Sequence, residues 1–372
     1  MTTSSAASPP AERVRPLELF FDLVFVFTIT QVAAVLTADP SAPGLARAVG
    51  LLAIIWWMYG GYAWLTNSLD LSRTAPRLLL LTGMAAYFVM SLAVPRFYDE
   101  GPYGLILGLA YLVVVTVHLA AFLGTSGRGA ILRLGPINVV AALLVVVAGI
   151  VSPPARPWVL LAAVGLHYAS PFLVGIGGFV IGAGHFVERH ALALIILLGE
   201  SIIAVGTVAS ERGEVLPLVL GSVLALAVSA GMWWLYFERD GLDSEELLDA
   251  MPPRRRGLAA LLSFGFAYLV VIIGVTMAAV GMKKAITYFT EPLHDFELWL
   301  LPLGLVTYLV GLAAFHRALA PGWPWSRLVA AATALLCVPA GLLAGGWLML
   351  LVGAVVLAGA VLVSRAPALN GR

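Results

Sequence analysis

The sequence predicts an all-α protein, a polytopic bundle of about twelve helices that spans a membrane. Of its 372 residues, 61% are hydrophobic and 11% are charged, whereas soluble proteins carry about 25% charged residues. The apolar residues form repeated runs of about 20, the length that an α-helix needs to cross the hydrocarbon core. Membrane lipid is therefore the expected partner. Nucleic acid is not expected, because the net charge is +1 and no long basic run occurs.

The predicted spans follow one another along the chain with short connections. They lie near residues 17–37, 45–66, 77–95, 103–123, 133–151, 157–176, 190–209, 217–237, 258–280, 297–315, 326–344 and 345–363. Residues 1–14 and 365–372 are expected to be cytoplasmic tails, the first of them disordered. Two places are less regular: the glycine-rich segment 175–184, which could re-enter the membrane, and the Gly345-Gly346 break between the last two spans.

The distribution of basic residues predicts the orientation of the chain. With the N-terminus inside, fifteen of the 21 Lys and Arg residues fall on the cytoplasmic side and six on the other. Positive charge concentrates in cytoplasmic loops of membrane proteins. We therefore expect both termini in the cytoplasm and the protein in the cytoplasmic (inner) membrane of a bacterium.

Internal similarity predicts two six-span halves, residues 15–184 and 185–364. Asp22 in the first span and Glu200 in the seventh are 178 residues apart, and the Trp-Trp-x-Tyr stretches that begin at Trp56 and Trp233 are 177 apart. An even number of spans gives both halves the same orientation, so the symmetry axis would run along the membrane normal. Chance similarity between apolar helices is the competing explanation.

Acidic side chains stand within the first span. Glu18 and Asp22 are four residues apart and share a helix face, and Gln31 follows further along. A position at the membrane surface, paired with Arg15 and near the positive end of the helix, explains Glu18. Asp22 lies deeper among phenylalanines. It is either a functional or gating carboxylate or one side of an internal salt bridge with Arg189, Arg77 or Arg239.

The stretch HFVERHALALIILLGESIIAVG, residues 185–206, carries the deepest acidic group. Glu200 and Ser201 stand in its apolar run, and no charged residue is near them in the sequence. An ionisable residue at this depth usually faces the bundle interior or a water-filled cavity. Glu200 is therefore either a protonatable or cation-coordinating group, with a partner on another span, or a protonated structural link between helices.

A polar cluster precedes Glu200 on the same helix and consists of His185, Glu188, Arg189 and His190. We expect the first three to share a face and the cluster to form hydrogen bonds and ion pairs at the cytoplasmic mouth of the span. A zinc site would need HExxH or HxxEH, and the spacing fits neither. No metal ligand is predicted.

Trp56 and Trp57 lie too deep in the second span for an interfacial belt. They either pack against the carboxylate-bearing helix or offer a surface to a cation or ring. Trp233 and Trp234 repeat the pair in the eighth span. Enzyme signatures such as a nucleophile elbow or a phosphate-binding loop are missing, and Cys337 is the single cysteine. No catalytic residue and no cofactor is predicted.

Three stretches together resemble the bacterial low temperature requirement A (LtrA) family. They are LELFFDLVFVFTITQ at 17–31, WWMYGGYAWLTNSLD at 56–70 and residues 185–206 given above. The resemblance implies a multi-pass bacterial membrane protein, linked by the family name to growth in the cold. It implies no settled molecular activity. The family often has a histidine in the ninth span, where this chain has Tyr268.

The leading hypothesis for function is a transporter or channel-like permeation protein for protons or a small cation. Asp22 and Glu200 would line its path, together with Glu18, Gln31, Ser201 and the tryptophan pairs. A likeness between FFDLVFVFTIT and the first-helix motif of potassium channels with six-span repeats is an analogy, since Phe21 takes the place of a serine. The alternatives are a membrane-embedded enzyme acting on a lipid or isoprenoid and a non-transporting cold or stress adaptation protein.

Overall fold

The protein is a bundle of membrane-spanning helices. A computed structural model describes residues 14–179, 181–212 and 215–365. All regular elements in these ranges are helical, and twelve stretches are long and apolar enough to cross a membrane. The predicted fold class is confirmed. The expected tails, 1–14 and 365–372, lie outside the described residues except for Val14 and Arg365.

The first six spans agree with the predicted ones to within a few residues. They are α1 (Pro16–Ala38), α2 (Ala42–Thr66), α3 (Thr74–Ala93), α4 (Tyr103–Phe122), α5 (Arg128–Ile150) and α6 (Arg156–Val174), with short 3-10 turns η1 (Val94–Arg96) and η2 (Pro153–Ala155). Local signals set several of these ends. Ser41, for example, caps α2 by accepting a hydrogen bond of 3.1 Å from the backbone N–H of Gly44.

The last six spans are less regular, because π-helical turns interrupt two of them. The seventh is α7 (Ala183–Arg212). The eighth comprises η3 (Pro217–Gly221), α8 (Ser222–Leu235), η4 (Tyr236–Asp240) and α9 (Gly241–Asp249), and the ninth comprises α10 (Pro253–Ala260), η5 (Leu261–Ala267) and α11 (Tyr268–Thr287). The final three are α12 (Glu297–Leu319), the pair α13 (Trp325–Ala334) and α14 (Cys337–Ala344), and α15 (Gly346–Arg365).

Matching pairs of helices touch in the two halves of the chain. In the first half α1 packs on α2 and α3, the helices α3 to α6 pack in sequence, and α2 returns to α6. In the second half α7 packs on α8 and α11, then α11, α12, α13 and α15 pack in sequence, and α8 returns to α15. This correspondence is what two copies of one unit would produce. The repeat and its parallel axis stay predictions.

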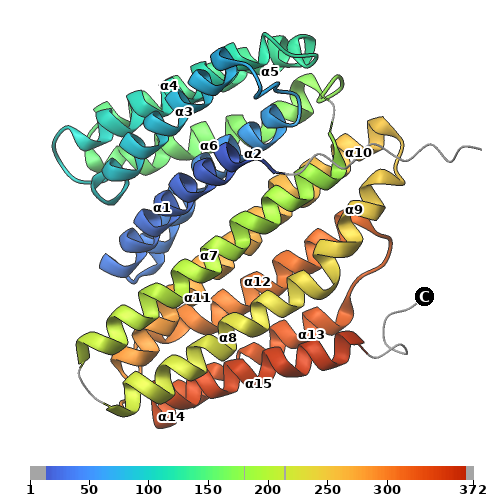
Figure 1. Ribbon diagram of the computed structural model, residues 1–372. Coiled ribbons are helices and arrows are strands. Elements are labelled where there is room, and N and C mark those ends of the chain that lie inside the picture. The colour runs from blue at the N-terminus through green and yellow to red at the C-terminus, as the bar shows by residue number, and fades with distance from the viewer. Residues whose placement is uncertain (1–13, 180, 213–214, 366–372) are drawn as a thin grey trace, which may run out of the picture.

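The two halves meet along a seam between α1 and α2 on one side and α7, η5 and α11 on the other. Figure 1 shows the blue and green first half beside the yellow and red second half, with α1 and α7 next to each other. Residues from both sides of the seam belong to one continuous core of buried side chains. The most interesting polar residues of the sequence lie on the helices of this seam.

Glycines permit close contacts between helices and form the irregular turns. A Cβ at Gly281 of α11 would lie 2.3 Å from the backbone nitrogen of Leu301 in α12, so small residues let the two helices touch. Gly345, with φ of +90°, forms the expected break before α15. The glycine-rich segment 175–184 is the connection between α6 and α7, and its Phe179 packs on Trp64 and Phe122.

Candidate functional site

The acidic residue in the middle of α1 meets an arginine of α7. Nη2 of Arg189 lies 3.3 Å from Oδ1 of Asp22, and both side chains are 0% exposed. Of the three partners expected for Asp22, the structure therefore selects Arg189. This contact joins the two halves of the bundle, because α1 belongs to the first and α7 to the second.

Glu18 belongs to the same buried group. Nε2 of His185 lies 3.0 Å from its Oε2, and Nη1 of Arg189 lies 3.9 Å from its Oε1. The backbone N–H of Arg15 also donates a 2.8 Å hydrogen bond to Oε2, which replaces the side-chain pairing expected for Arg15. The side chain of Glu18 is 1% exposed, because the helix turns this face toward α7. The expected position of Glu18 at the membrane surface stays a prediction.

Arg189 completes its hydrogen bonds with α2. Its Nη1 donates a 3.2 Å hydrogen bond to the backbone carbonyl of Tyr62 and another hydrogen bond to Oγ1 of Thr66. The guanidinium carbon lies 5.3 Å from the ring centre of Phe21 and 5.6 Å from that of Tyr59. Buried charges are tolerated when they are paired and hydrogen-bonded in this way, and aromatic faces add a further attraction.

The group, which we call the seam cluster (Glu18, Asp22, His185 and Arg189), does not balance its own charge. Two carboxylates share one guanidinium, so the formal charge is −1 with a neutral imidazole and zero with a protonated one. In the described part of the chain, Oε1 of Glu18 and Oδ2 of Asp22 accept no hydrogen bond. A negative charge away from water is costly, and one additional positive charge within the cluster would neutralise it.

Two other residues of the predicted polar cluster do not join these four. Glu188 is exposed, and its Oε2 accepts a 3.3 Å hydrogen bond from the N–H of Val14. Glu188 stands on the same turn of α7 as His185 and Arg189, but its side chain is exposed and stays outside the buried group. His190 is buried, and its Nδ1 lies 2.8 Å from the backbone carbonyl of Phe186.

Glu200 lies at a different level of the bundle. It is eleven residues beyond Arg189 on nearly the same face of α7, which corresponds to about 16 Å along the helix. Glu200 is half-buried, and its charge attracts Lys283 near the C-terminal end of α11. The two carboxylates that the sequence matched, Asp22 and Glu200, are thus not brought together.

Ser201 and Gln31 are the polar residues predicted beside these carboxylates. Ser201 is 3% exposed, and its hydroxyl donates a 3.0 Å hydrogen bond to the backbone carbonyl of Leu197 in its own helix. Gln31 is half-buried further along α1. Neither side chain touches the seam cluster.

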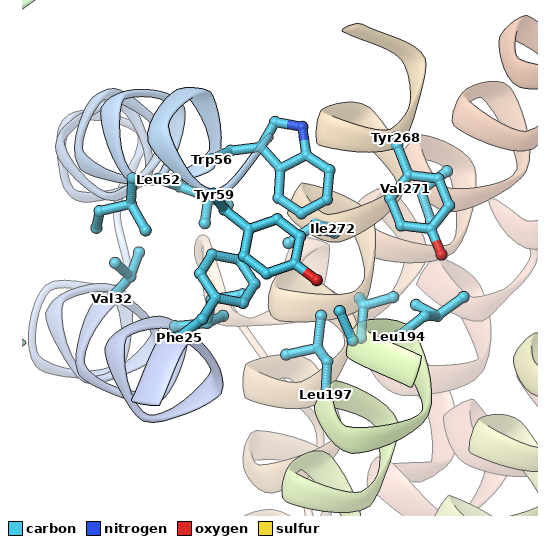
Figure 2. Close-up of a cluster of buried hydrophobic side chains, with 14 of the residues drawn as sticks. Phe25, Val32, Leu52, Trp56, Tyr59, Leu194, Leu197, Tyr268, Val271 and Ile272 are labelled. Atoms are coloured by element: carbon cyan, nitrogen blue, oxygen red, sulfur yellow. The ribbon is translucent and has the colours of Figure 1, made fainter. Parts of the chain in front are cut away.

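A packed apolar layer separates the seam cluster from the level of Glu200. Figure 2 shows Phe25, Trp56 and Tyr59 of the first half facing Leu197 and Tyr268 of the second. The ring centres of Phe25 and Tyr59 are 4.0 Å apart, and those of Trp56 and Tyr268 are 5.6 Å apart. These side chains are at most 4% exposed, so the layer closes the seam at this level.

The first tryptophan pair lines the interior. Nε1 of Trp56 donates to the backbone carbonyls of Phe264 and Gly265 in η5, at 3.1 Å and 3.0 Å. Trp57 points to the other side of α2, where its Nε1 donates a 3.2 Å hydrogen bond to Oδ1 of Asn138. Both tryptophans border a pocket of about 70 Å³, which His118 also lines.

The second tryptophan pair has a different environment. Trp233 and Trp234 are 43% and 40% exposed and lie on the outer surface of α8. Trp56 and Trp57 therefore face the interior and Trp233 and Trp234 do not, so the second pair is not placed to line an internal path. An exposed indole is compatible with contact to lipid. The two Trp-Trp-x-Tyr stretches are therefore alike in sequence, but their tryptophan side chains lie in different environments.

A second buried ion pair, which was not predicted from the sequence, lies in the other half of the chain. Nη2 of Arg327 lies 2.8 Å from Oδ1 of Asp240, and the two side chains are 7% and 3% exposed. His316 lies 4.0 Å from the same oxygen. Asp240 stands in a charged stretch that reads as a loop, and its burial follows from η4 continuing the eighth span. Lys283 was likewise expected in a loop.

Comparison with known proteins places the chain in a family. It is 28% identical over 331 residues to the uncharacterized protein RA0937 of Rhizobium meliloti (strain 1021), which covers 84% of this chain and 79% of that protein. No solved structure matches the chain. The family described as bacterial low temperature requirement A protein (LtrA) matches residues 13–363, nearly the whole chain. The protein therefore belongs to the bacterial low temperature requirement A family.

Proposed function

We propose that the protein moves protons, or a small monovalent cation, across the bacterial cytoplasmic membrane. The observation that carries the proposal is the charge of the seam cluster, in which the buried carboxylates of Glu18 and Asp22 share the single guanidinium of Arg189. A proton on one carboxylate or on His185, or a bound cation, neutralises the cluster. Buried ionisable groups inside a helix bundle are typical of proton and ion pathways.

The position of the cluster supports a carrier rather than an open pore. His185 is 10% exposed and provides the contact with the outside of the bundle, whereas Asp22 is fully buried behind it. Beyond Asp22 the aromatic layer of Phe25 and Tyr59 closes the seam, and Glu200 lies on the far side of that layer. This arrangement is that of an occluded state, open at neither level for an ion to pass.

The experiment that tests the proposal is a flux assay on the purified protein in liposomes. A pH-sensitive dye inside the liposomes reports proton entry under an imposed potential, and a series of alkali cations is tested in parallel. We expect wild-type flux, loss of flux in Asp22→Asn and in Glu18→Gln, and wild-type flux in Glu188→Gln. Glu188 is the matched control, because it is an exposed acid on the same helix turn as the cluster.

Two results would overturn the proposal. The first is the absence of flux for any of the ions from wild-type protein that is folded, which would leave the enzymatic and non-transporting alternatives. The second is wild-type flux that survives both Asp22→Asn and Glu18→Gln. A loss of flux in Glu188→Gln equal to that in Asp22→Asn would also assign the effect to surface charge instead of the cluster.

A further inference from the structure

A groove runs along one edge of the seam, on the outer surface of the bundle. Its volume is about 690 Å³, within the range of about 300–1,000 Å³ that small-molecule sites have. The first half supplies one wall with residues of α2 and α6, among them Val49 and Tyr168, and the second half supplies the other with residues of η5, α11 and α12. The groove is thus formed by both halves and belongs to neither.

The floor and walls of the groove are almost wholly apolar. The ring centres of Tyr168 from α6 and Phe266 from η5 are 5.2 Å apart and meet across the seam. Along the ninth span the lining runs from Leu262 to Val270, and these nine residues cover about 12 Å along the helix axis. One leaflet of the hydrocarbon core is about 15 Å thick. The groove therefore has the depth of one leaflet.

One end of the groove is cationic. Arg317, near the C-terminal end of α12, is exposed and lines the groove, and in the described part of the chain it makes no ion pair. Arg255 is also exposed and precedes the groove residue Leu262 by seven residues, which is two helical turns on the same face. Trp323 lines the same end and is 54% exposed. Tryptophan beside basic residues is typical of the headgroup level of a membrane.

From this combination we propose that the groove is a binding site for an anionic phospholipid. One acyl chain lies in the apolar groove between the halves, and the phosphate contacts Arg317. A zwitterionic lipid such as phosphatidylcholine would offer the same phosphate beside a choline cation that repels the guanidinium, so the site should prefer a headgroup with a net negative charge. The proposal does not depend on the transport function, because binding can be measured without flux.

The test is lipid binding to the purified protein by native mass spectrometry. Phosphatidylglycerol and phosphatidylcholine with identical acyl chains are titrated separately. We expect wild-type protein to prefer phosphatidylglycerol and Arg317→Gln to weaken its binding by about fivefold, because a basic residue near an anionic headgroup is worth about 1 kcal/mol. Arg128→Gln is the matched control. Arg128 is exposed at the start of α5, away from the groove, and its loss should leave the preference unchanged.

A second variant tests the apolar part of the site. Ala318→Phe fills the groove beside Arg317 without removing charge, and it should weaken the binding of both lipids. The proposal is overturned if Arg317→Gln keeps the wild-type preference for phosphatidylglycerol. It is also overturned if Arg128→Gln loses as much binding as Arg317→Gln, since the effect would then be that of general surface charge. The Arg317 change is at an exposed position, so this arm does not depend on the folding of Ala318→Phe.

Discussion

Removing the arginine of the seam cluster should destabilise the protein more than removing the acid that pairs with it. Arg189→Gln leaves the carboxylates of Glu18 and Asp22 buried without their guanidinium. Breaking a buried ion pair from one side costs about 3–5 kcal/mol, because the remaining charge is uncompensated. We expect a loss in the free energy of unfolding of that size for Arg189→Gln.

Asp22→Asn should cost less, about 1–3 kcal/mol. The guanidinium of Arg189 then keeps its contact with Glu18 at 3.9 Å and its hydrogen bonds to Tyr62 and Thr66. The same change also removes one of the two carboxylates that share the guanidinium. The difference between the two variants in the loss of unfolding free energy therefore reports the excess negative charge of the cluster.

The double variant completes a thermodynamic cycle. Asp22→Asn combined with Arg189→Gln should lose less stability than the two single changes added together, with a coupling of about 0.5–3 kcal/mol, because contacting residues are not independent. Equilibrium unfolding in mixed detergent micelles measures each variant. Arg128→Gln at the exposed start of α5 is the control and should stay within about 0.5 kcal/mol of wild type.

The reasoning is refuted by either of two results. One is a loss in Arg189→Gln no larger than that in Arg128→Gln. The other is strict additivity in the cycle, which would mean that the 3.3 Å contact between Arg189 and Asp22 carries no interaction energy. A loss in Asp22→Asn larger than in Arg189→Gln would contradict the charge count on which the proposed function depends.

Three further predictions concern other parts of the bundle. Glu200→Gln should abolish flux in liposomes, and exchanging the charges in Glu200→Lys with Lys283→Glu should restore part of it, because the two residues attract each other. Arg327→Gln should lower the unfolding free energy by about 3–5 kcal/mol with flux kept in the protein that folds, since its pair lies outside the seam. Gly281→Leu should prevent folding or lower the melting temperature sharply in a thermal scan. Gly206→Ala, where a Cβ meets nothing within 4 Å, should leave it unchanged.

The fold was predictable because its signals are local. A run of about 20 apolar residues is recognised without any knowledge of its neighbours, and the helices from α1 to α6 begin and end close to the predicted bounds. The breaks at Gly345 and after α6 were predictable for the same reason, since glycine permits the positive φ that those turns require. The sequence also predicted two repeated halves, and that repeat stays a prediction.

The partners within the site were only partly predictable. Arg189 was one of three possible partners for Asp22, because its position on α7 gave no information about which helix α1 touches. The burial of Glu18 was missed, since an acid in a first helical turn near an arginine is well explained by the membrane surface. The π-turn η5 was not expected either, and it holds the two carbonyls to which Trp56 donates across the seam.

The contacts across the seam suggest how loading and movement are linked in the proposed function. Apolar rings make most of the seam, and the contacts of Asp22 and Glu18 with Arg189 are buried ionic links across it. A proton on Asp22 removes one charge from these links, which weakens the attraction between the halves while it neutralises the cluster. A proton therefore both occupies the site and lowers the cost of opening the seam that encloses it, which is the differential interaction that a carrier needs.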